Sequence, residues 1–597
     1  MTTSPSALPR TLCEAFAITA AAQPDAIALR TPGGTVTITW REYRERVRAI
    51  ASGLSGLGLR PGDTVAIMLT NRPEFHLCDT AVLHAGGTPF SVYNTNPAEL
   101  LAYQFDNAET RLVICESQFL PVVLTAVAQG GKVEHIVCVD GTPNGTVGLA
   151  ELENSPDPDF DFDAAWCAVR PDDVLTIVYT SGTTGPPKGV ELTHTNFLEN
   201  SRTMGDFGGV DSSDSTLSYL PDAHAANRWF AHYHNLLCGV QTTTVADMRD
   251  AVGALTDVRP TIFVAVPRVW VKIKAALEAN VAAQPSVKRA LANWALEVGR
   301  AKVRAESDGR ALSLLDQVRY GIADRLVLSG IRARIGLDRL RIGVTGAAPI
   351  APEILEFVLG LGLPICEAYG MTEATLGATI NRPGRIRLGT VGTPLTGTEV
   401  TLAPDGEVLV RGANVMRGYR KQPDKTAEAI DADGWLHTGD IGEFDADGYL
   451  RIIDRKKEII INAAGKNMSP TNIENAIIAH TPLAGPVVVI GDGRQYNTAL
   501  ITLDPDTVAA LADKFGLTDR SPDAVAAHPE IVAAVAAGVA AANRGLSRVE
   551  QIKKYTLLAE TWEPGSPHLT PTGKLRRKPI AATYAEVIEH MYTATQG

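Results

Sequence analysis

The chain has 597 residues and a formal net charge of −12 at neutral pH. Because this length exceeds what one compact core supports, we expect two or more domains. A hydrophobic content of 45% and a charged content of 20% are those of an ordinary globular protein. The excess of acidic residues argues against a nucleic-acid partner.

The cysteines and the first residues bear on the compartment. The seven cysteines contain no Cys-x-x-Cys pair, which fits small buried thiols in a reducing cytosol. The N-terminus lacks the basic head and apolar core of a signal peptide. No uninterrupted apolar run reaches membrane-spanning length. We therefore expect a cytoplasmic protein without a transmembrane segment, either free or peripheral to the inner membrane face.

Residues 1–170 alternate helical and strand patterns, which predicts α/β layering around a largely parallel sheet. Helical spacing is expected over 41–57 and 71–85, and buried strands at 64–69 and near Leu112 and Val133. The acidic, Gly- and Pro-punctuated range 141–163 is predicted to be an exposed connector.

A loop rich in glycine and hydroxyl residues follows a predicted buried strand at 174–178 and precedes a predicted helix that begins at Thr193. It reads Tyr179-Thr-Ser-Gly-Thr-Thr-Gly-Pro-Pro-Lys-Gly-Val190. Glycines let backbone N–H groups turn toward an anion, and the hydroxyls add further donors. No Gly-Lys-Ser/Thr closes a four-residue gap, so this is not a Walker A sequence. We expect phosphate at Thr180, Ser181, Gly182, Thr183, Thr184, Gly185 and Lys188.

Further ordered motifs follow along the chain. A strand pattern over 262–270 precedes a long helical stretch, roughly 271–340, rich in Ala, Leu, Arg and Lys. Residues 398–453 are turn-rich and β-like, and residues after 455 mix strands with helices. The short motifs are Leu220-Pro-Asp-Ala-His224 with Arg228, Gly343-Val-Thr-Gly-Ala-Ala-Pro349, Tyr369-Gly-Met-Thr-Glu373, Trp435-Leu-His-Thr-Gly-Asp440, Asp454-Arg-Lys-Lys-Glu458 and Thr570-Pro-Thr-Gly-Lys574.

In this order the motifs closely resemble those of the adenylate-forming superfamily, which includes acyl-CoA synthetases, luciferases and the adenylation domains of peptide synthetases. The Val266-Pro-Arg-Val-Trp270 entry and the length of the helical stretch resemble its long-chain fatty acid branch. That branch carries a glutamate where this chain has Asn227. The departure puts the local ion pairing and the acyl preference in question.

The resemblance implies an α/β fold in two parts. A large N-terminal domain over 1–454 would hold layered α/β subdomains, a β-rich subdomain and a helical insert at about 271–340. A small, mobile α+β domain over 455–597 would carry the hinge and the catalytic lysine.

The resemblance also implies a role for each candidate residue. His224 would guard the carboxylate pocket, and Tyr369 would stack on adenine. Thr372 would donate to the α-phosphate and Glu373 would hold Mg²⁺. Asp440 would accept from the ribose hydroxyls, a task that suits an acceptor-only carboxylate. Arg455 would contact the ribose or phosphate, Lys457 would be the pivot, and Lys574 would be catalytic. The residues on the CoA side would be Ala463, Ala464 and Gly465. The acyl pocket would be formed by Trp229, Gly346, Ala347 and Ala348.

The implied reaction activates a medium- or long-chain fatty acid with ATP and Mg²⁺ to acyl-AMP, and transfers the acyl group to coenzyme A. The partners would be small molecules, and the chain a monomer or homodimer. One alternative is an acyl-AMP ligase that loads a carrier protein, although its extra insert before the hinge is not seen between Gly434 and Arg455. Another is an aryl- or other carboxylic acid–CoA ligase, which the 271–340 stretch disfavours. The non-enzyme alternative is an inactive nucleotide-binding regulator, disfavoured by the presence of Glu373 and Lys574.

Overall fold

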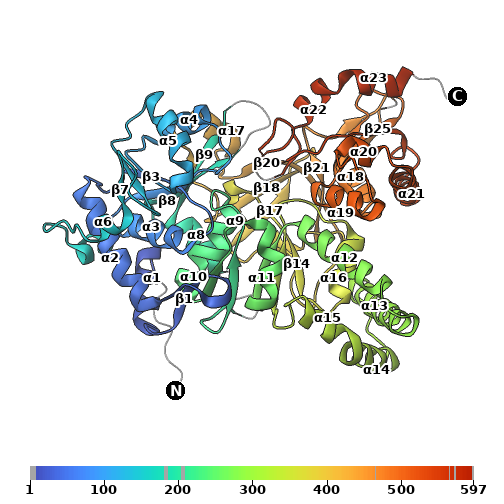
Figure 1. Cartoon of the computed structure of the whole chain (residues 1–597), viewed down its shortest axis with the longest axis horizontal. Helices are drawn as coiled ribbons and strands as arrows, with labels where there is room; N and C mark the ends of the chain where they lie inside the picture. Colours follow the sequence, from blue (N-terminus) through green and yellow to red (C-terminus); the bar gives the residue numbers. More distant parts are fainter. Residues whose placement is uncertain are drawn as a thin grey trace.

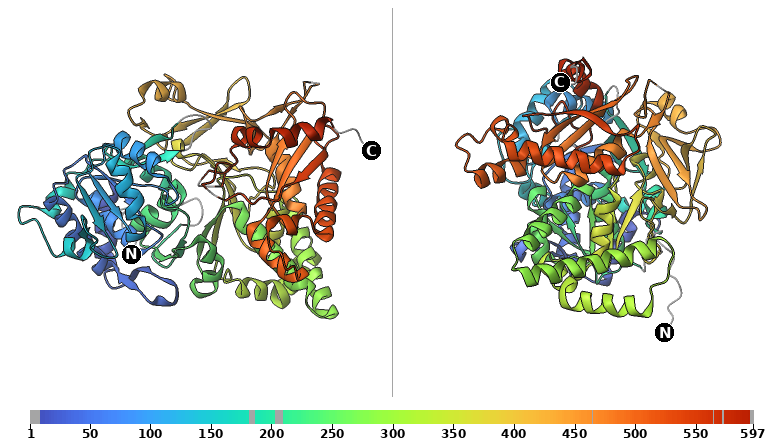
Figure 2. Two further views of the ribbon diagram at one scale, coloured as in Figure 1. Left: turned by 45° about the horizontal axis from the view of Figure 1, so that its top comes forward. Right: turned by 90° about the vertical axis from the view of Figure 1, so that its right-hand side faces the viewer.

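The computed structural model describes residues 9–180, 186–202, 209–463, 465–563, 565–570 and 573–593. Figures 1 and 2 show an N-terminal region of several sheets with their helices, and a smaller C-terminal unit lying against it.

The first part of the chain forms a parallel five-stranded sheet in the order β4-β3-β5-β6-β7. Its central strands are fully buried, as expected of strands covered on both faces. This confirms the predicted α/β layering. The strands are β3 (Thr64–Met68), β4 (Thr88–Ser91), β5 (Leu112–Cys115), β6 (His135–Cys138) and β7 (Val147–Gly148), and the accompanying helices are α1 (Leu12–Ala22), α2 (Trp40–Gly56), α3 (Pro73–His84), α4 (Ala98–Ala108), α5 (Leu120–Ala128), α6 (Leu149–Glu153) and α7 (Phe162–Cys167).

Two further sheets flank the site. One has the order β10-β11-β1-β2, and the other has the order β12-β13-β14-β15-β16, with its first three strands parallel. The motif that begins at Tyr369 lies at the carboxyl end of β14, where an open parallel sheet places ligand contacts. The strands are β1 (Ile27–Arg30), β2 (Thr37–Thr39), β10 (Ser215–Ser218), β11 (Gln241–Thr244), β12 (Ile262–Ala265), β13 (Ile342–Thr345), β14 (Ile365–Tyr369), β15 (Thr379–Ile380) and β16 (Thr393–Pro394).

The phosphate-loop candidate joins two antiparallel strands, β8 (Val174–Thr180) and β9 (Lys188–Thr193), with Thr180 opposite Lys188. The expected helix, α8 (His194–Arg202), starts only after β9. The sequence interpretation passed directly from loop to helix and missed this second strand. No helix N-terminus therefore follows the loop directly, because β9 lies between the loop and α8. The short strand β19 (Gly418–Tyr419) completes the sheet beside β9.

The expected β-rich region is the antiparallel sheet β17-β18-β20-β21. Its last two strands place Asp440 directly opposite Arg455, so two successive motifs meet on one ladder. The elements are β17 (Thr398–Leu402), β18 (Glu407–Gly412), β20 (Leu436–Phe444), β21 (Leu450–Arg455) and the helix α17 (Pro423–Ala429).

The long stretch predicted to be helical is helical. It consists of α12 (Pro267–Ala282), α13 (Ser286–Ser307), α14 (Leu314–Ala323), a π-helical segment (Asp324–Leu328) and α15 (Ser329–Arg334). Helix α13 packs against α14 and against α16 (Pro352–Gly360). The other helices of the N-terminal region are α9 (Ala225–Asn227), a π-helical turn (Arg228–Tyr233), α10 (His234–Cys238) and α11 (Ala251–Val258).

After β21 the chain forms a smaller α+β unit with hydrophobic clusters of its own, made of residues between Ile460 and Met591. Its three-stranded sheet has the order β24-β25-β26, and β22 pairs with β23. The elements are β22 (Ile460–Ile461), β23 (Asn467–Met468), β24 (Ala484–Ile490), β25 (Asn497–Leu503), β26 (Ile552–Leu557), α18 (Pro470–His480), α19 (Pro505–Phe515), α20 (Pro522–Ala526), α21 (Pro529–Gly545), α22 (Arg577–Thr583) and α23 (Ala585–Thr593).

The packing of α13 on α16 yields a stability prediction. A Cβ at Gly299 would lie 2.0 Å from the Gly360 carbonyl oxygen. Gly299→Ala should therefore force the helices apart and cost about 1–3 kcal/mol. Gly321→Ala is the matched control, because it lies in α14 and has nothing within 4 Å; it should gain up to about 1 kcal/mol of helix propensity. Thermal melts test both, and equal melting temperatures for the two variants would contradict the close contact.

Candidate active site

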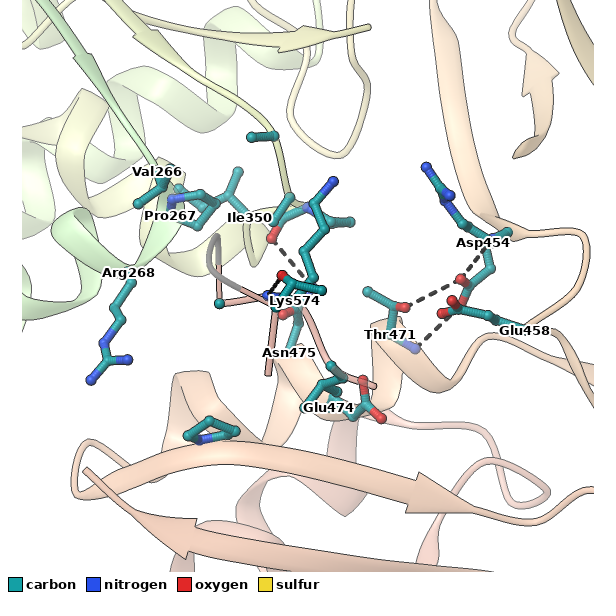
Figure 3. A pocket seen from close by; sticks show the side chains of 18 of the residues that line it. Val266, Pro267, Arg268, Ile350, Asp454, Glu458, Thr471, Glu474, Asn475 and Lys574 are labelled. Carbon is teal, nitrogen blue, oxygen red and sulfur yellow. Dashed lines mark hydrogen bonds between the residues drawn. The ribbon is translucent and has the colours of Figure 1, made fainter. Parts of the chain in front are cut away.

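A cavity of about 3290 Å³ lies between the N-terminal region and the C-terminal unit. Ligand sites are typically about 300–1,000 Å³, so this one has room for more than one substrate. Figure 3 shows part of its wall, with Lys574 and Asn475 from the C-terminal unit beside Ile350 from the N-terminal region. Arg268 pairs with Asp504 at 2.5 Å, and the Asn475 amide donates to the Pro349 carbonyl at 3.4 Å. These two contacts hold the units together away from the connecting strand.

One corner of the cavity is built around Asp440. The Tyr369 hydroxyl donates to Asp440 Oδ2 at 2.7 Å, and Arg455 Nε lies 3.1 Å from Asp440 Oδ1. Burial raises the pKa of the Asp440 carboxyl, while the Arg455 guanidinium opposes that shift. The corner thus presents an aromatic ring, an acceptor and a cation within a few ångströms, which suits a nucleoside with its phosphate.

A second corner contains Glu373 and Lys188. The Tyr419 hydroxyl donates to Glu373 Oε1 at 2.9 Å, and the Lys188 ammonium lies 3.8 Å from the centre of the Tyr419 ring. Burial lowers the pKa of Lys188, and the Glu373 carboxylate opposes the effect. Tyr419 therefore orients both groups. The sequence analysis assigned Tyr419 only to the β-like region and did not predict it as a site residue. The one indication in the sequence was an aromatic residue two positions after Arg417.

Lys574 enters the cavity from the loop before α22, on the C-terminal unit. Desolvation and the neighbouring Arg455 lower the pKa of its ammonium group, while Asp440, Glu373 and Glu458 raise it. The cation thus faces carboxylates and another cation of the N-terminal region. Clustered cations destabilise one another, so an anion bound among them is stabilised.

The loop that carries Lys574 is anchored by Arg577. Its guanidinium contacts Glu474 at 2.6 Å and Glu458 at 3.1 Å, and these carboxylates hold its pKa above the usual value despite burial. Glu474 lies on α18 and Glu458 on the turn after β21. The anchor ties the Lys574 loop to the connection between the units.

His224 lines the cavity at the start of α9. Its Nδ1 accepts a hydrogen bond from the Ala226 amide at 3.1 Å. Burial, with Lys574 nearby, lowers the pKa of the imidazole to about 4. The ring is therefore neutral at physiological pH, and because Nδ1 accepts, the hydrogen-bond pattern assigns the proton to Nε2. That leaves a neutral N–H donor at the wall.

Asn227 is hydrogen-bonded in a buried polar network, in which Asp222 Oδ2 and Arg228 Nε have no hydrogen-bond partner among the described residues. The Asn227 amide donates to Asp222 Oδ1 at 2.5 Å and to Ser218 Oγ at 2.9 Å. Arg228 finds its carboxylate elsewhere, in buried Asp79 at 2.6 Å. Burial raises the pKa of Asp222 well above its usual range, while the Asn227 amide and the Arg228 guanidinium oppose that shift. The network around Asn227 therefore still contains a carboxyl group, that of Asp222, although position 227 itself carries an amide.

The acyl-pocket candidates divide between the cavity and the core. Gly346, Ala347 and Ala348 line the cavity, and a Cβ at Gly346 would lie 3.0 Å from the Ala368 carbonyl. Trp229 instead packs in the hydrophobic core, stacked on His234. Its neighbour Phe230 lines the cavity. Together with Val264, Val271, Ala275, Ala276 and Ala279, Phe230 makes one side of the cavity apolar.

The remaining candidates lie as follows. Thr180, Thr372 and Lys457 line the cavity, with Lys457 exposed in the turn after β21. Ala463 and Gly465 lie in the β22–β23 hairpin and are not among its lining residues. Ser181, Gly182, Thr183, Thr184, Gly185 and Ala464 lie outside the described residues.

The comparison with other structures concerns the fold. An anthranilate–CoA ligase, AuaEII, solved with anthranoyl-AMP, superposes with a TM-score of 0.74 at 19% identity, over 98% of this chain and all of that one. The fold is that of adenylate-forming enzymes. In the part of the chain that the structure describes, we find neither a cluster of His, Cys, Asp or Glu suited to a metal nor a helix with the length and apolar character to cross a membrane.

Sequence relatives extend this result. A family model described as AMP-binding enzyme matches residues 16–420, and one described as its C-terminal domain matches 457–596. The chain belongs to the AMP-binding enzyme family. It is 50% identical to the fatty-acid–CoA ligase fadD11 of Mycobacterium tuberculosis over 75% of this chain and 79% of that protein. It is 33% identical to the long-chain-fatty-acid–CoA ligase FadD15 of the same species, over 93% and 92%.

Glu367 was not singled out from the sequence, yet its side chain lines the cavity from β14. Burial raises the pKa of its carboxyl to about 8, while the Ile350 amide opposes that shift. The folded protein therefore binds a proton here that the unfolded chain releases above its ordinary pKa of 4.5. Stability from this group is fully present below that value and falls as pH rises toward 8.

Glu367→Gln should remove this dependence, because the amide cannot ionise. We expect the melting temperature of the variant, relative to that of the original protein, to rise between pH 5 and pH 8. Thermal melts across that range measure the difference. A difference that does not change with pH would mean that Glu367 is ionised throughout.

Proposed function

We propose that this chain is an AMP-forming fatty acid–CoA ligase that makes acyl-AMP from ATP and a medium- or long-chain fatty acid, then transfers the acyl group to coenzyme A. The observation that carries the proposal is one continuous cavity. It holds Lys574, Glu373, Asp440 and His224, and it extends along the apolar side of α12. The names of the relatives point to the same activity.

In the first step a carboxylate oxygen attacks the α-phosphorus of ATP, and the bond to pyrophosphate breaks. Two anions must meet, so the protein's contribution is positioning and charge neutralisation. Tyr369 and Asp440 would hold the nucleoside, and Lys188 the leaving phosphates. Lys574 would bridge the carboxylate and the α-phosphate, with the neutral His224 N–H donating to the carboxylate. A neutral donor suits this place, because His224 keeps its proton arrangement down to about its pKa of 4.

Mg²⁺ fits the Glu373 corner. This cation prefers one or two carboxylates together with substrate phosphates and water, and Glu373 is a carboxylate on the cavity wall with one oxygen already oriented by Tyr419. When bound, the ion would neutralise phosphate charge. Tyr419 would keep the carboxylate directed toward it.

In the second step the thiolate of coenzyme A attacks the acyl carbon, a thioester forms and AMP leaves. We propose that the unit after the 454/455 boundary rotates about Lys457, withdrawing Lys574. Ala463, Ala464 and Gly465 would then approach the pantetheine; Ala463 and Gly465 are not among the residues that line the cavity in this arrangement. Two reactions at one site need two arrangements, and a hinge provides them.

Unpaired thiols at all seven cysteines support a reducing, cytoplasmic location.

The role of Lys574 gives the first test. Lys574→Ala should lower the rate of acyl-AMP formation by about 10²–10³-fold, since one preorganised cation facing developing charge is typically worth that much. Thioester formation from pre-made acyl-AMP should be largely retained. AMP release that requires both fatty acid and coenzyme A is the assay.

Lys553→Ala is the matched control, because it removes an exposed lysine of the C-terminal unit that does not line the cavity. Its rates should remain those of the original protein. If Lys574→Ala slowed both half-reactions equally, the proposal that Lys574 acts mainly in acyl-AMP formation would be contradicted.

The acyl wall gives the second test. Each buried methylene contributes about 0.8 kcal/mol, or roughly fourfold in specificity. Ala348 lines the cavity, whereas its neighbour Ala347 has a left-handed φ of 67° that makes substitution there harder to interpret. Ala348→Trp should shift the preference toward shorter acids by about fourfold per excluded methylene, with the KM for ATP unchanged. Acetate or benzoate matching palmitate in the original protein would refute the fatty-acid assignment.

A further inference from the structure

The helices after α12 carry a row of apolar side chains that face solvent. Leu314, Leu315, Val318, Ile322 and Leu326, hereafter the α14 stripe, are 81%, 67%, 60%, 48% and 63% exposed. Their spacing of one, three, four and four residues places them on one face of a helix. Monomeric proteins rarely expose contiguous apolar surface of this kind without a partner.

The stripe is not the packing face of its helix. The opposite side of α14 and the π-helical segment buries Ala323 and Leu328 and sets Tyr320 under the Lys302 ammonium. Helix α13 covers that inner side. Figures 1 and 2 place α14 at the outer edge of the molecule, beyond α13. The apolar stripe therefore points away from the protein.

The charge around the stripe is opposite in sign to that of the whole chain. Residues 286–334 contain 10 Lys and Arg against 5 Asp and Glu, a balance of +5 in a chain of −12. Arg319 and Arg325 lie on α14 and its extension, both exposed. Arg319 reaches Asp316 only at 4.0 Å, and Arg325 has no carboxylate partner among the described residues. The combination is an apolar row with unneutralised cations beside it.

The apolar row and its neighbouring cations favour an anionic lipid surface over a second copy of the chain as the partner of the α14 stripe. A second copy of the chain would have to bring the same cations against themselves, which opposes self-association. An anionic lipid surface accepts both features at once, since an amphipathic helix buries its apolar face about 5–10 Å into the headgroup boundary and its basic residues contact the lipid phosphates.

The position of the stripe also suits a lipid surface. Helix α12 lines the apolar side of the cavity through Val271, Ala275, Ala276 and Ala279, and the same helical segment continues into α13 and α14. Helix α12 packs on α13 and α16. The wall of the acyl channel and the exposed stripe thus belong to one packed group of helices.

We propose that the α14 stripe is a docking surface for an anionic lipid bilayer, lying in the interface without crossing it, and that it brings the acyl cavity to membrane-dissolved fatty acid. The supply of fatty acid rests on the proposed function; the docking itself does not. Leucine and valine side chains enter the acyl boundary, while Arg319 and Arg325 contact headgroup phosphates.

Co-sedimentation of the full chain with vesicles tests the docking without ATP or coenzyme A. Vesicles of neutral phosphatidylcholine are compared with vesicles in which about one third of the lipid is phosphatidylglycerol. The original protein should bind the anionic vesicles. The triple variant Leu314→Ser, Leu315→Ser, Val318→Ser should bind them at least about tenfold more weakly, because its apolar face is removed.

Two variants serve as comparisons. Val36→Ser, Val532→Ser, Val549→Ser removes valines of 45%, 45% and 46% exposure outside the stripe, and should bind as the original protein does. Arg319→Gln, Arg325→Gln should lose about fivefold per arginine on anionic vesicles only. With a short fatty acid free in solution, all variants should keep the original rate, because the stripe is outside the active site.

Failure to sediment with anionic vesicles would overturn the proposal, and so would equal binding by the stripe and control variants. Sedimentation velocity tests the other possible occupant, a second copy of the chain. If the original protein is a dimer, the stripe variant is a monomer and neither binds vesicles, the α14 stripe is a self-association face instead. Vesicle binding by a protein inactive on every fatty acid would leave the docking intact and refute only the proposed function.

Discussion

The proposed chemistry depends on one long-range placement, in which the C-terminal unit carries the Lys574 cation into a cavity that also contains Asp440, Glu373 and Lys188 of the N-terminal region. Arg577 ties the lysine loop to Glu474 and Glu458. Asp454, at the end of β21, accepts from Ser469 and Thr471 at the start of α18. The Arg577–Glu474 pair lies within the C-terminal unit, so movement of the unit moves the charge. The Asp454 bonds cross the proposed pivot at Lys457 and would have to break during that movement.

Among the residues that the structure describes, the units meet away from the connecting strand through two polar side-chain contacts and through Ala479, which packs against the hydrophobic cluster of the N-terminal helices. Arg268 with Asp504 is a partly exposed ion pair, and such pairs are typically worth about 1 kcal/mol or less. The Asn475 bond to the Pro349 carbonyl is long at 3.4 Å. An interface of this kind can be broken and remade, whereas the separate hydrophobic clusters of the two parts keep each part folded. These contacts are compatible with the proposed rotation.

Ordered motifs allowed much of the site to be predicted, because each motif sits on one strand end or turn. Tyr369 and Asp440 are examples, and the structure joins them by a hydrogen bond. Other features depend on tertiary geometry that a local pattern does not encode. Trp229 was expected at the acyl wall, but the π-helical turn over Arg228–Tyr233 rotates successive side chains by less than an α-helix does, and Phe230 lines the cavity instead. Glu367 lies two residues before the Tyr369 motif, but a local pattern does not encode its burial beside the cavity.

The central claim, one site used in two arrangements, is tested most directly by Lys457→Pro. Proline fixes φ near about −65° and removes a backbone donor, so it should restrict rotation at the turn after β21 while the arrangement with Lys574 in the cavity persists. The measurement is fatty-acid-dependent exchange of pyrophosphate into ATP, set beside thioester formation from pre-made acyl-AMP. The account predicts that exchange survives and thioester formation fails. Normal thioester formation in this variant would contradict a pivot at Lys457 and, with it, the two-arrangement account.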